Sequence, residues 1–190
     1  MTEKRFDIYI VLFRFVEVRR WQQIDDQMTQ EKFDKMMRIK GYVTLSGKDY
    51  SGKPTNIVLT DTNSSIPNHK DSFVRLIRLV KDKIILISNR VLTTNNVAVA
   101  AEHKIDIESY TFDKFAIDMT KAPYVPHHSI VEEEEATELL ASIYKNRYDM
   151  PKILQSDTQI IWLGAKQGDL IRIIRLSEAT GESMTYRVVI

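Results

Sequence analysis

Cysteine is absent from this chain of 190 residues, which excludes disulfide bonds and cysteine-ligated zinc. An apolar run long enough for a membrane-spanning helix, roughly 20 residues, is also missing. The longest candidate, Ile8–Val18, is interrupted by Arg14 and Glu17. The charged start Glu3-Lys4-Arg5 has no small-residue cleavage site behind it and does not fit a secretory signal. We therefore expect an intracellular protein with no membrane partner.

Motifs that carry chemistry are equally scarce. The glycine turn Gly164–Gly168 lacks the spacing of a phosphate-binding loop, and we interpret it as a connection between strands. The acidic run Glu132–Glu135 fits the positive end of a helix dipole better than a metal site, because consecutive helical residues point in different directions. Ser177 and Glu178 have no histidine that the order of elements would bring near, so they do not indicate a nucleophile. The sequence predicts no catalytic residue.

Four histidines are present without the spacing of a zinc site, and the default interpretation is a structural or interface role: His69, His103, His127 and His128. We therefore expect no metal and no cofactor. The net charge is +1 and 43% of the residues are hydrophobic, which is typical of a globular protein that does not bind nucleic acid tightly through its overall charge.

The first part of the chain predicts a small α/β layer domain. Apolar residues at three- and four-residue spacing predict a helix over Phe6–Ile24, and Thr29 and Gly41 fit the cap and stop of a second helix ending at Lys40. The further elements that we expect alternate between strand and helix: strands Tyr42–Leu45 and Asn56–Thr60, helix Ser72–Val80, strand Lys83–Ser88, helix Val97–His103 and strand Ile107–Phe112.

Two prolines in Ala122–Pro126 indicate a stiff, extended connector, and we place a domain boundary there, giving domains 1–122 and 123–190. The second domain is expected to be a small α/β domain with a mixed sheet. Gly181 is expected at the tip of a hairpin. The expected elements are helix Glu132–Tyr144, a short helical turn opened by Pro151, and strands Ile160–Leu163, Leu170–Arg175 and Thr185–Ile190.

The segment Ser88–Asn96 is the candidate for contact with nucleic acid. It follows a predicted buried strand, precedes a helix, and offers hydroxyl, amide and arginine side chains. Such groups contact phosphates without reading base sequence. An ordinary polar loop between strand and helix fits the same residues equally well, so both interpretations stay open.

A series of motifs runs from Val125 to the end of the chain. The motifs are Val125-Pro126-x-His128, Thr137-Glu138-Leu139-Leu140, Met150-Pro151-x-Ile153, Gly164-x-Lys166-x-Gly168, Ile173–Glu178 and Tyr186-Arg187. In this order they resemble the C-terminal assembly domain of the fifth subunit common to eukaryotic nuclear RNA polymerases, a family that also has archaeal members. The front part is similar, more loosely, to the jaw domain that eukaryotic members carry and archaeal ones lack.

The resemblance implies a non-catalytic subunit of a DNA-directed RNA polymerase, with the catalytic residues in other subunits. Its partners would be the largest polymerase subunit, neighbouring small subunits and downstream duplex DNA, the last bound weakly and independently of sequence. The DNA-contact candidates are Arg90, Thr93, Thr94 and Asn95. The subunit-docking candidates are Pro126, His128, Lys166, Arg175, Ser177, Glu178, Tyr186 and Arg187.

Several positions depart from the family pattern, such as Thr158 in place of a proline after Asp157, and Leu176 in place of the proline before Ser-Glu. These departures are typical of a fast-diverging copy, such as large cytoplasmic DNA viruses encode. We expect the nucleus as location for a cellular protein, and the host cytoplasm and virion for a viral one. The alternative function is a free-standing transcription regulator that uses the same fold without being a stoichiometric subunit. An independent small enzyme, the third interpretation, would need a deep pocket lined by titratable groups.

Overall fold

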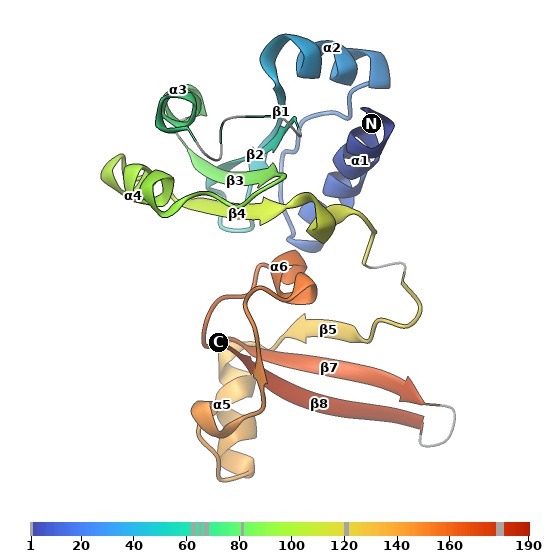
Figure 1. The fold of residues 1–190 in the computed structure, drawn as a ribbon. Coiled ribbons are helices and arrows are strands. Elements are labelled where there is room, and N and C mark those ends of the chain that lie inside the picture. Colours follow the sequence, from blue (N-terminus) through green and yellow to red (C-terminus); the bar gives the residue numbers. More distant parts are fainter. Residues whose placement is uncertain are drawn as a thin grey trace. The chain divides into compact units, whose positions relative to one another are not determined.

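The computed structural model describes residues 2–61, 64, 66, 69–80, 82–119, 122–177 and 181–190. The chain divides into two compact units, Met1–Ile117 and Asp118–Ile190 (Figure 1). Within the described ranges, no helix is both long and apolar enough to cross a lipid bilayer. The division into domains 1–122 and 123–190 stays a prediction, which the unfolding experiments below address.

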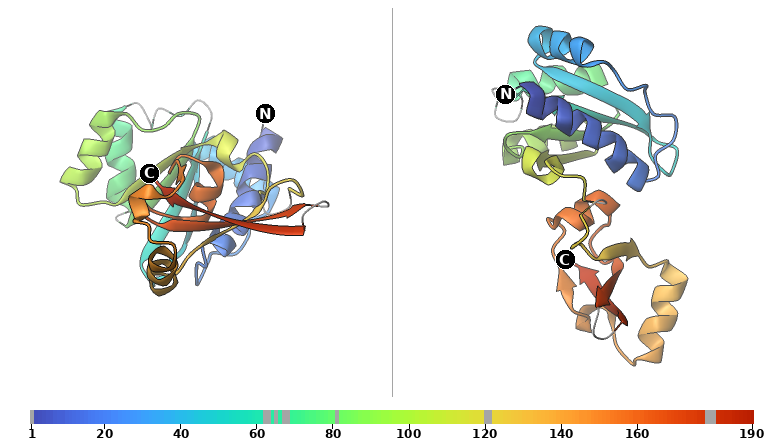
Figure 2. Two further views of the ribbon diagram at one scale, coloured as in Figure 1. Left: turned by 90° about the horizontal axis from the view of Figure 1, so that it is seen from below. Right: turned by 90° about the vertical axis from the view of Figure 1, so that its right-hand side faces the viewer.

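The first unit is a sheet of order β1-β2-β3-β4 with helices on its faces (Figures 1 and 2). Strands β1 and β2 are antiparallel, whereas β2, β3 and β4 run parallel. The elements are α1 (Thr2–Val18), α2 (Gln30–Lys40), β1 (Tyr42–Lys48), β2 (Pro54–Thr60), α3 (Lys70–Val80), β3 (Lys83–Ser88), α4 (Thr94–Glu102), β4 (Ile107–Thr111) and the 3-10 turn η1 (Phe112–Phe115).

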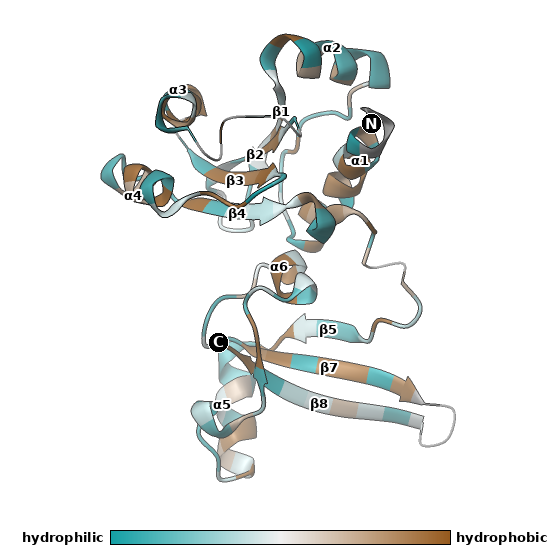
Figure 3. Ribbon diagram, viewed as in Figure 1, coloured by the Kyte–Doolittle hydropathy of each residue, from teal (hydrophilic) through white to brown (hydrophobic). Residues whose placement is uncertain are grey.

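Helices α3 and α4 pack on one face of this sheet and bury the even-numbered residues of the central strand β3. Ile84 and Leu86 are fully buried there against Phe73 of α3 and Val99 of α4. Helix α1 lies on the other face of the sheet (Figure 2), to which strand alternation assigns the odd-numbered residues of β3. Both faces of β3 are covered, and its residues Ile84–Ile87 form an unbroken apolar run, as expected of a strand in a parallel layer (Figure 3).

The predicted boundaries of helix α2 are confirmed by its caps. The Thr29 hydroxyl accepts a hydrogen bond from the Lys32 amide at 3.4 Å, and Gly41 adopts a left-handed φ of 74° while its N–H donates to the Met37 carbonyl. These groups satisfy backbone atoms that a helix end leaves without partners.

The first helix is shorter than the predicted Phe6–Ile24, because α1 ends at Val18. Beyond it, Arg20 and Gln23 take positive φ values of 56° and 50° and turn the chain back toward the sheet. The Gln22 amide then donates to the Lys48 carbonyl at 2.7 Å. The apolar spacing could not show this turn, since buried Trp21 continues the helical pattern.

The second unit is a mixed sheet of order β5-β7-β8-β6. Strands β5, β7 and β8 form antiparallel pairs, and β6 is parallel to β8. The elements are β5 (His127–Ile130), α5 (Glu133–Ser142), the 3-10 turn η2 (Arg147–Asp149), β6 (Lys152–Ile153), α6 (Thr158–Leu163), β7 (Leu170–Ser177) and β8 (Gly181–Val189).

Helices α5 and α6 cover opposite faces of this sheet. Leu170 and Val188 pack against Ala136 of α5, whereas their strand neighbours Ile171 and Val189 pack against Ile160 of α6. This alternation follows from the two-residue period of a strand. It assigns every residue of β7 and β8 to either the α5 face or the α6 face.

Two predictions for this unit are wrong. Ile160–Leu163 was expected to be a strand, but it lies in helix α6. Asp157 caps the start of this helix, where its carboxylate accepts from the Gln159 amide at 2.8 Å, and Gly164 caps its end with a φ of 72°. A short apolar run does not distinguish a strand from a buried helical turn. Pro151 does not open a helical turn either, because η2 and the extended Met150 precede it and strand β6 begins directly after it, at Lys152.

Candidate docking and nucleic-acid contact surfaces

The segment after β3 is held firmly by the elements around it. The Leu92 side chain is buried, and its amide donates to the Ser109 hydroxyl of β4 at 3.0 Å. The Ser88 hydroxyl donates to the Arg90 carbonyl. The Thr93 hydroxyl caps α4 by accepting from the Asn96 amide at 3.4 Å. These contacts fix the backbone between the strand and the helix.

The structure places all four predicted DNA-contact residues together on this exposed segment. Arg90, Thr93, Thr94 and Asn95 all have exposed side chains. Helix α4 begins at Thr94 rather than at the predicted Val97, so Thr94 and Asn95 occupy its first turn and not a loop. The segment also lies at the carboxyl ends of the parallel strands, where open α/β sheets present ligand-contacting groups. Whether these residues touch DNA stays a prediction.

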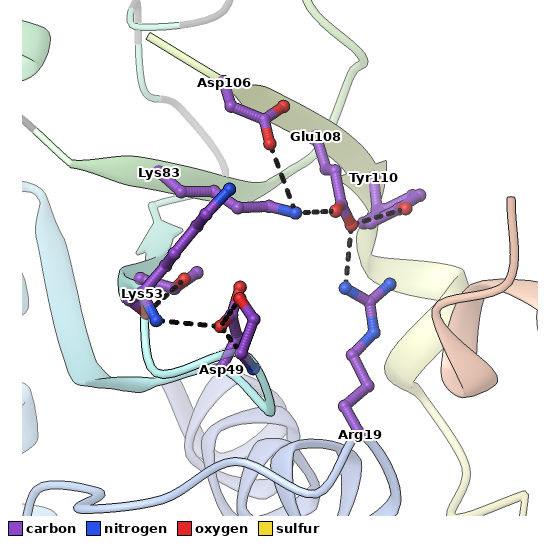
Figure 4. Close-up of polar contacts among 9 residues, drawn as sticks. Arg19, Asp49, Lys53, Lys83, Asp106, Glu108 and Tyr110 are labelled. Atoms are coloured by element: carbon purple, nitrogen blue, oxygen red, sulfur yellow. Dashed lines mark hydrogen bonds and ion pairs between the residues drawn. The ribbon is translucent and has the colours of Figure 1, made fainter.

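At the opposite end of the parallel strands, a cluster of charged groups surrounds Glu108 (Figure 4). The Arg19 guanidinium lies 2.8 Å from Glu108 Oε2, and the Lys83 ammonium lies 2.8 Å from Glu108 Oε1. The Tyr110 hydroxyl donates to the same carboxylate at 2.9 Å. The Lys83 ammonium also lies 3.4 Å from Asp106 Oδ2. Residues from α1's end, β3 and β4 are thereby tied together.

The pKa values in this cluster follow from burial and charge. Burial would raise the pKa of Glu108, but the adjacent Arg19 and Lys83 outweigh it and lower that pKa to about 2. Burial and the Glu108 charge raise the pKa of Tyr110 to about 12. At neutral pH the carboxylate is charged and the phenol is a neutral donor. Both groups are engaged with each other, so we interpret the cluster as structural.

The sequence analysis did not find this cluster. Arg19 and Glu108 are 89 residues apart in the chain, and no spacing rule links them. Only the pairing of β3 with β4 brings Lys83 beside Glu108. The cluster becomes visible once the parallel register is known.

In the second unit, the predicted docking residues lie on both faces of the sheet. His128 and Pro126 are in contact, since the His128 Nδ1 atom lies 2.7 Å from the Pro126 carbonyl oxygen. Burial of the half-exposed ring lowers the pKa of His128. By strand alternation, His128, Arg175 and Arg187 belong to the α6 face. Tyr186 belongs to the α5 face, where it packs at the edge of that core.

Of the remaining docking candidates, Lys166 lies in the connection between α6 and β7. Its side chain is exposed, and its amide donates to the Asp169 carboxylate at 2.7 Å. Ser177 ends β7, but its side chain and the whole of Glu178 lie outside the described residues. The predicted set therefore marks no single patch. Strand β5 was missed, because only four residues after a proline form it.

Among the described residues, no group of three or more histidine, aspartate or glutamate side chains is arranged to hold a metal ion. The acidic residues of α5 instead engage arginines. Arg147 bonds both Glu133, at 2.6 Å, and the Gly168 carbonyl, at 3.1 Å, and Arg172 pairs with Glu135. These contacts fasten α5 to the sheet and to the turn before β7.

Comparison with known proteins reveals one matching family and several relatives. Residues 117–189 match the family model for the C-terminal domain of RNA polymerase Rpb5. The chain is 24% identical over 196 residues to the DNA-directed RNA polymerase RPB5 homolog of African swine fever virus (isolate Warthog/Namibia/Wart80/1980), a match that covers 96% of this chain and 95% of the relative. It is 44% identical over 66 residues to the DNA-directed RNA polymerase subunit Rpo5 of Methanocaldococcus jannaschii, which is 35% of this chain and 85% of the relative. The corresponding subunit of Sulfolobus acidocaldarius is 43% identical over 77 residues, or 40% of this chain and 92% of that relative.

Proposed function

Because this chain belongs to the Rpb5 family of DNA-directed RNA polymerase subunits, which includes the archaeal Rpo5 proteins, we propose that it is a non-catalytic subunit of a multisubunit RNA polymerase. The observation that carries the proposal is the similarity to a viral polymerase subunit along 96% of the chain. Catalysis would take place on other subunits. Nothing in the charged cluster around Glu108 contradicts this role, because its groups are engaged with one another.

The second unit is the part that we propose to dock on the largest subunit and on neighbouring small subunits. The match to one archaeal subunit is 66 residues long and covers 85% of that subunit. A domain of about this size therefore makes up most of the archaeal protein. The family model for the C-terminal domain matches residues 117–189, which is nearly the whole second unit. Docking through this unit is the simplest role that short and long relatives can share.

Co-purification tests the subunit role directly. A tagged copy of the full chain, produced where its polymerase is assembled, is expected to recover the largest subunit at one copy per enzyme. Recovery of no large polymerase subunit would sink the proposal. Substoichiometric recovery, with rapid exchange against untagged protein, would favour the alternative of a free-standing transcription regulator.

The first unit would lie beside downstream DNA, with the segment that follows β3 facing the duplex. The hydrogen bonds of Leu92 and Thr93 support this proposal, since a segment that is already ordered loses little entropy on contact. The exposed groups are one arginine, two threonines and an asparagine, which suit phosphate contacts better than base readout.

Replacing Arg90 by alanine is expected to weaken the contact with downstream DNA to the same extent on every sequence. One lost phosphate contact should reduce the slope of log affinity against log salt by about 0.9. The measurement is the salt dependence of DNA binding by the assembled polymerase on at least two downstream sequences. Arg38→Ala is the matched control, because Arg38 is an exposed arginine of α2 in the same unit. A loss that depends on the DNA sequence, or an unchanged slope, would refute the phosphate contact.

The location follows from the origin of the gene. The viral relative covers nearly the whole chain, which fits the expectation of a divergent viral copy. For such a copy we propose the host cytoplasm and the virion, and for a cellular protein the nucleus.

A further inference from the structure

Strand β8 has a long open edge. It pairs with β7 from Gly181 to Val188, but on its other side β6 covers only Val188 and Val189. Within the described part of the chain, no strand pairs with β8 on that side between residues 181 and 187. Figure 1 shows the β7–β8 hairpin running well past β6 and α5.

Pro151 explains where the pairing with β6 stops. The Val188 and Ile190 amides donate to the Pro151 and Ile153 carbonyls, at 2.8 and 2.9 Å, and the Gln155 amide donates to the Ile190 carbonyl at 2.9 Å. In a parallel ladder with this pattern, the next acceptor on β8 is the Tyr186 carbonyl, and its donor would be the N–H of residue 151. Proline has no N–H. The ladder therefore ends, and the edge beyond it is left open.

The same pattern identifies the backbone groups that face outward. The Val189 amide bonds the Asp169 carbonyl on the β7 side, at 3.0 Å, whereas Val188 bonds β6. Successive residues of a strand point their backbone groups to opposite sides. The N–H and C=O groups of Glu182, Met184 and Tyr186 therefore point to the open edge.

Natural proteins protect such an edge with charge, proline or a bulge, because it otherwise pairs with other chains. Here the four residues Ser183–Tyr186 are uncharged and contain no proline. The register with β7 continues without a bulge from Gly181 to Val188. Two charged residues, Glu182 and Arg187, stand near the ends of the open edge, and only its centre between them lacks these protective features.

The two faces of the hairpin specify what kind of segment fits. On the α5 face the hairpin carries Ile174, Leu176 and Met184, and also Glu182, which lies opposite Leu176. Leu176 is 86% exposed and Met184 is 48% exposed. On the α6 face it carries Arg175, Ser183 and Thr185. A strand added to β8 would continue both faces, so its side chains should alternate between apolar and polar, with acidic groups suited to the side of Arg175.

We propose that a neighbouring polymerase subunit supplies an extended segment of alternating apolar and polar or acidic residues, which pairs with the outer edge of β8 over Glu182–Tyr186. The proposal rests on the proposed subunit role and specifies how the second unit docks. Main-chain hydrogen bonds would provide the affinity, and contact with the Met184 side chain on the α5 face would set the register.

The test compares two changes at one residue. Met184→Pro removes an outward N–H and places a ring on the open edge, while the ladder to β7 loses no donor. Met184→Ala removes the side chain and keeps the N–H. The readout is recovery of the polymerase by the tagged full chain. We expect Met184→Pro to lower the affinity at least tenfold relative to the unmodified chain, and we expect the loss for Met184→Ala to be several times smaller than that.

Two further measurements keep the test decisive. Glu182→Pro acts at the next outward-facing position and serves if Met184→Pro does not fold, as judged by circular dichroism of the free chain. Amide exchange of the unmodified protein needs no variant: on assembly, the Met184 and Tyr186 amides should gain at least tenfold protection, whereas Thr185 and Arg187 are already bonded to β7 and should change little.

The outcomes separate the two proposals. If the unmodified chain recovers no polymerase, the subunit role fails. If it recovers polymerase, but the proline variants bind as well as Met184→Ala does, strand addition is wrong and the subunit role stands. Unchanged exchange at Met184 and Tyr186 in the complex would also overturn strand addition alone.

Discussion

Replacing Glu108 by glutamine is expected to lower the free energy of unfolding of the first unit by about 2 kcal/mol, between the values for exposed and for buried ion pairs, because the Glu108 side chain is 24% exposed. The Arg19 side chain is only 8% exposed and that of Lys83 20%, so both cations would lose a partner that water replaces poorly. Urea unfolding followed through Trp21 fluorescence measures the effect, in a background where Trp162 is replaced by phenylalanine. Trp21 and Trp162 are the two tryptophans of the chain, and each lies in a different unit.

Asp106→Asn is the matched control, because the Asp106 side chain also pairs with Lys83 but is 70% exposed. Exposed pairs of this kind contribute between about 0 and 1 kcal/mol. Equal losses for the two variants would show that burial does not set the strength of the Glu108 contacts.

The same variant should show a characteristic pH dependence. The pKa of Glu108 is about 2 in the folded chain, below its ordinary value of 4.5, so the folded state stabilises the carboxylate. That contribution is complete above pH 4.5 and is lost as the pH falls toward 2. The difference in unfolding free energy between wild type and Glu108→Gln should therefore shrink over this range. A constant difference down to pH 2 would contradict the assignment.

Replacing Ile171 by alanine should destabilise the second unit by about 2–5 kcal/mol, the usual cost of a cavity left by a large aliphatic side chain. Ile171 is fully buried between β7 and α6. Trp162, which is 1% exposed in α6, reports the unfolding of this unit, and Trp21 should report an unchanged first unit. Leu176→Ala on the same strand is the control, because its side chain is 86% exposed and its loss should cost less than about 0.5 kcal/mol.

This experiment also tests the predicted domains. If Trp21 and Trp162 report transitions that shift together when Ile171 is replaced, the chain unfolds as one cooperative body and the division near residue 122 is wrong. Separate transitions would support two domains with independent cores.

Local signals in the sequence predicted the elements that local contacts determine. Helix α2 was predicted to its ends, because Thr29 and Gly41 are the residues that the cap and the left-handed stop require. Strand β3 was predicted to the residue, because an apolar run between polar segments suits a strand buried on both faces. Helix α6 was mistaken for a strand, since its four-residue apolar run fits both.

What depends on strand pairing could not be predicted. The cluster around Glu108 exists only through the alignment of β3 with β4. The proposed DNA-contact residues depend less on pairing, because they follow one another closely in the sequence. Their side chains are exposed, although α4 starts three residues earlier than expected. The docking candidates came from a resemblance, and their distribution over two faces required the register of β7 and β8.

Pro151 divides the outer edge of β8 into a paired part and an open part. Toward its end β8 pairs with β6, whereas before that point the main-chain groups that face away from β7 have no strand partner within the described residues. Pro151 therefore marks the point where the pairing of β8 with β6 ends and the open edge begins, to which we propose that another subunit adds a strand. A residue with an amide hydrogen at this position would supply one donor for the Tyr186 carbonyl and shorten the open edge by that one bond.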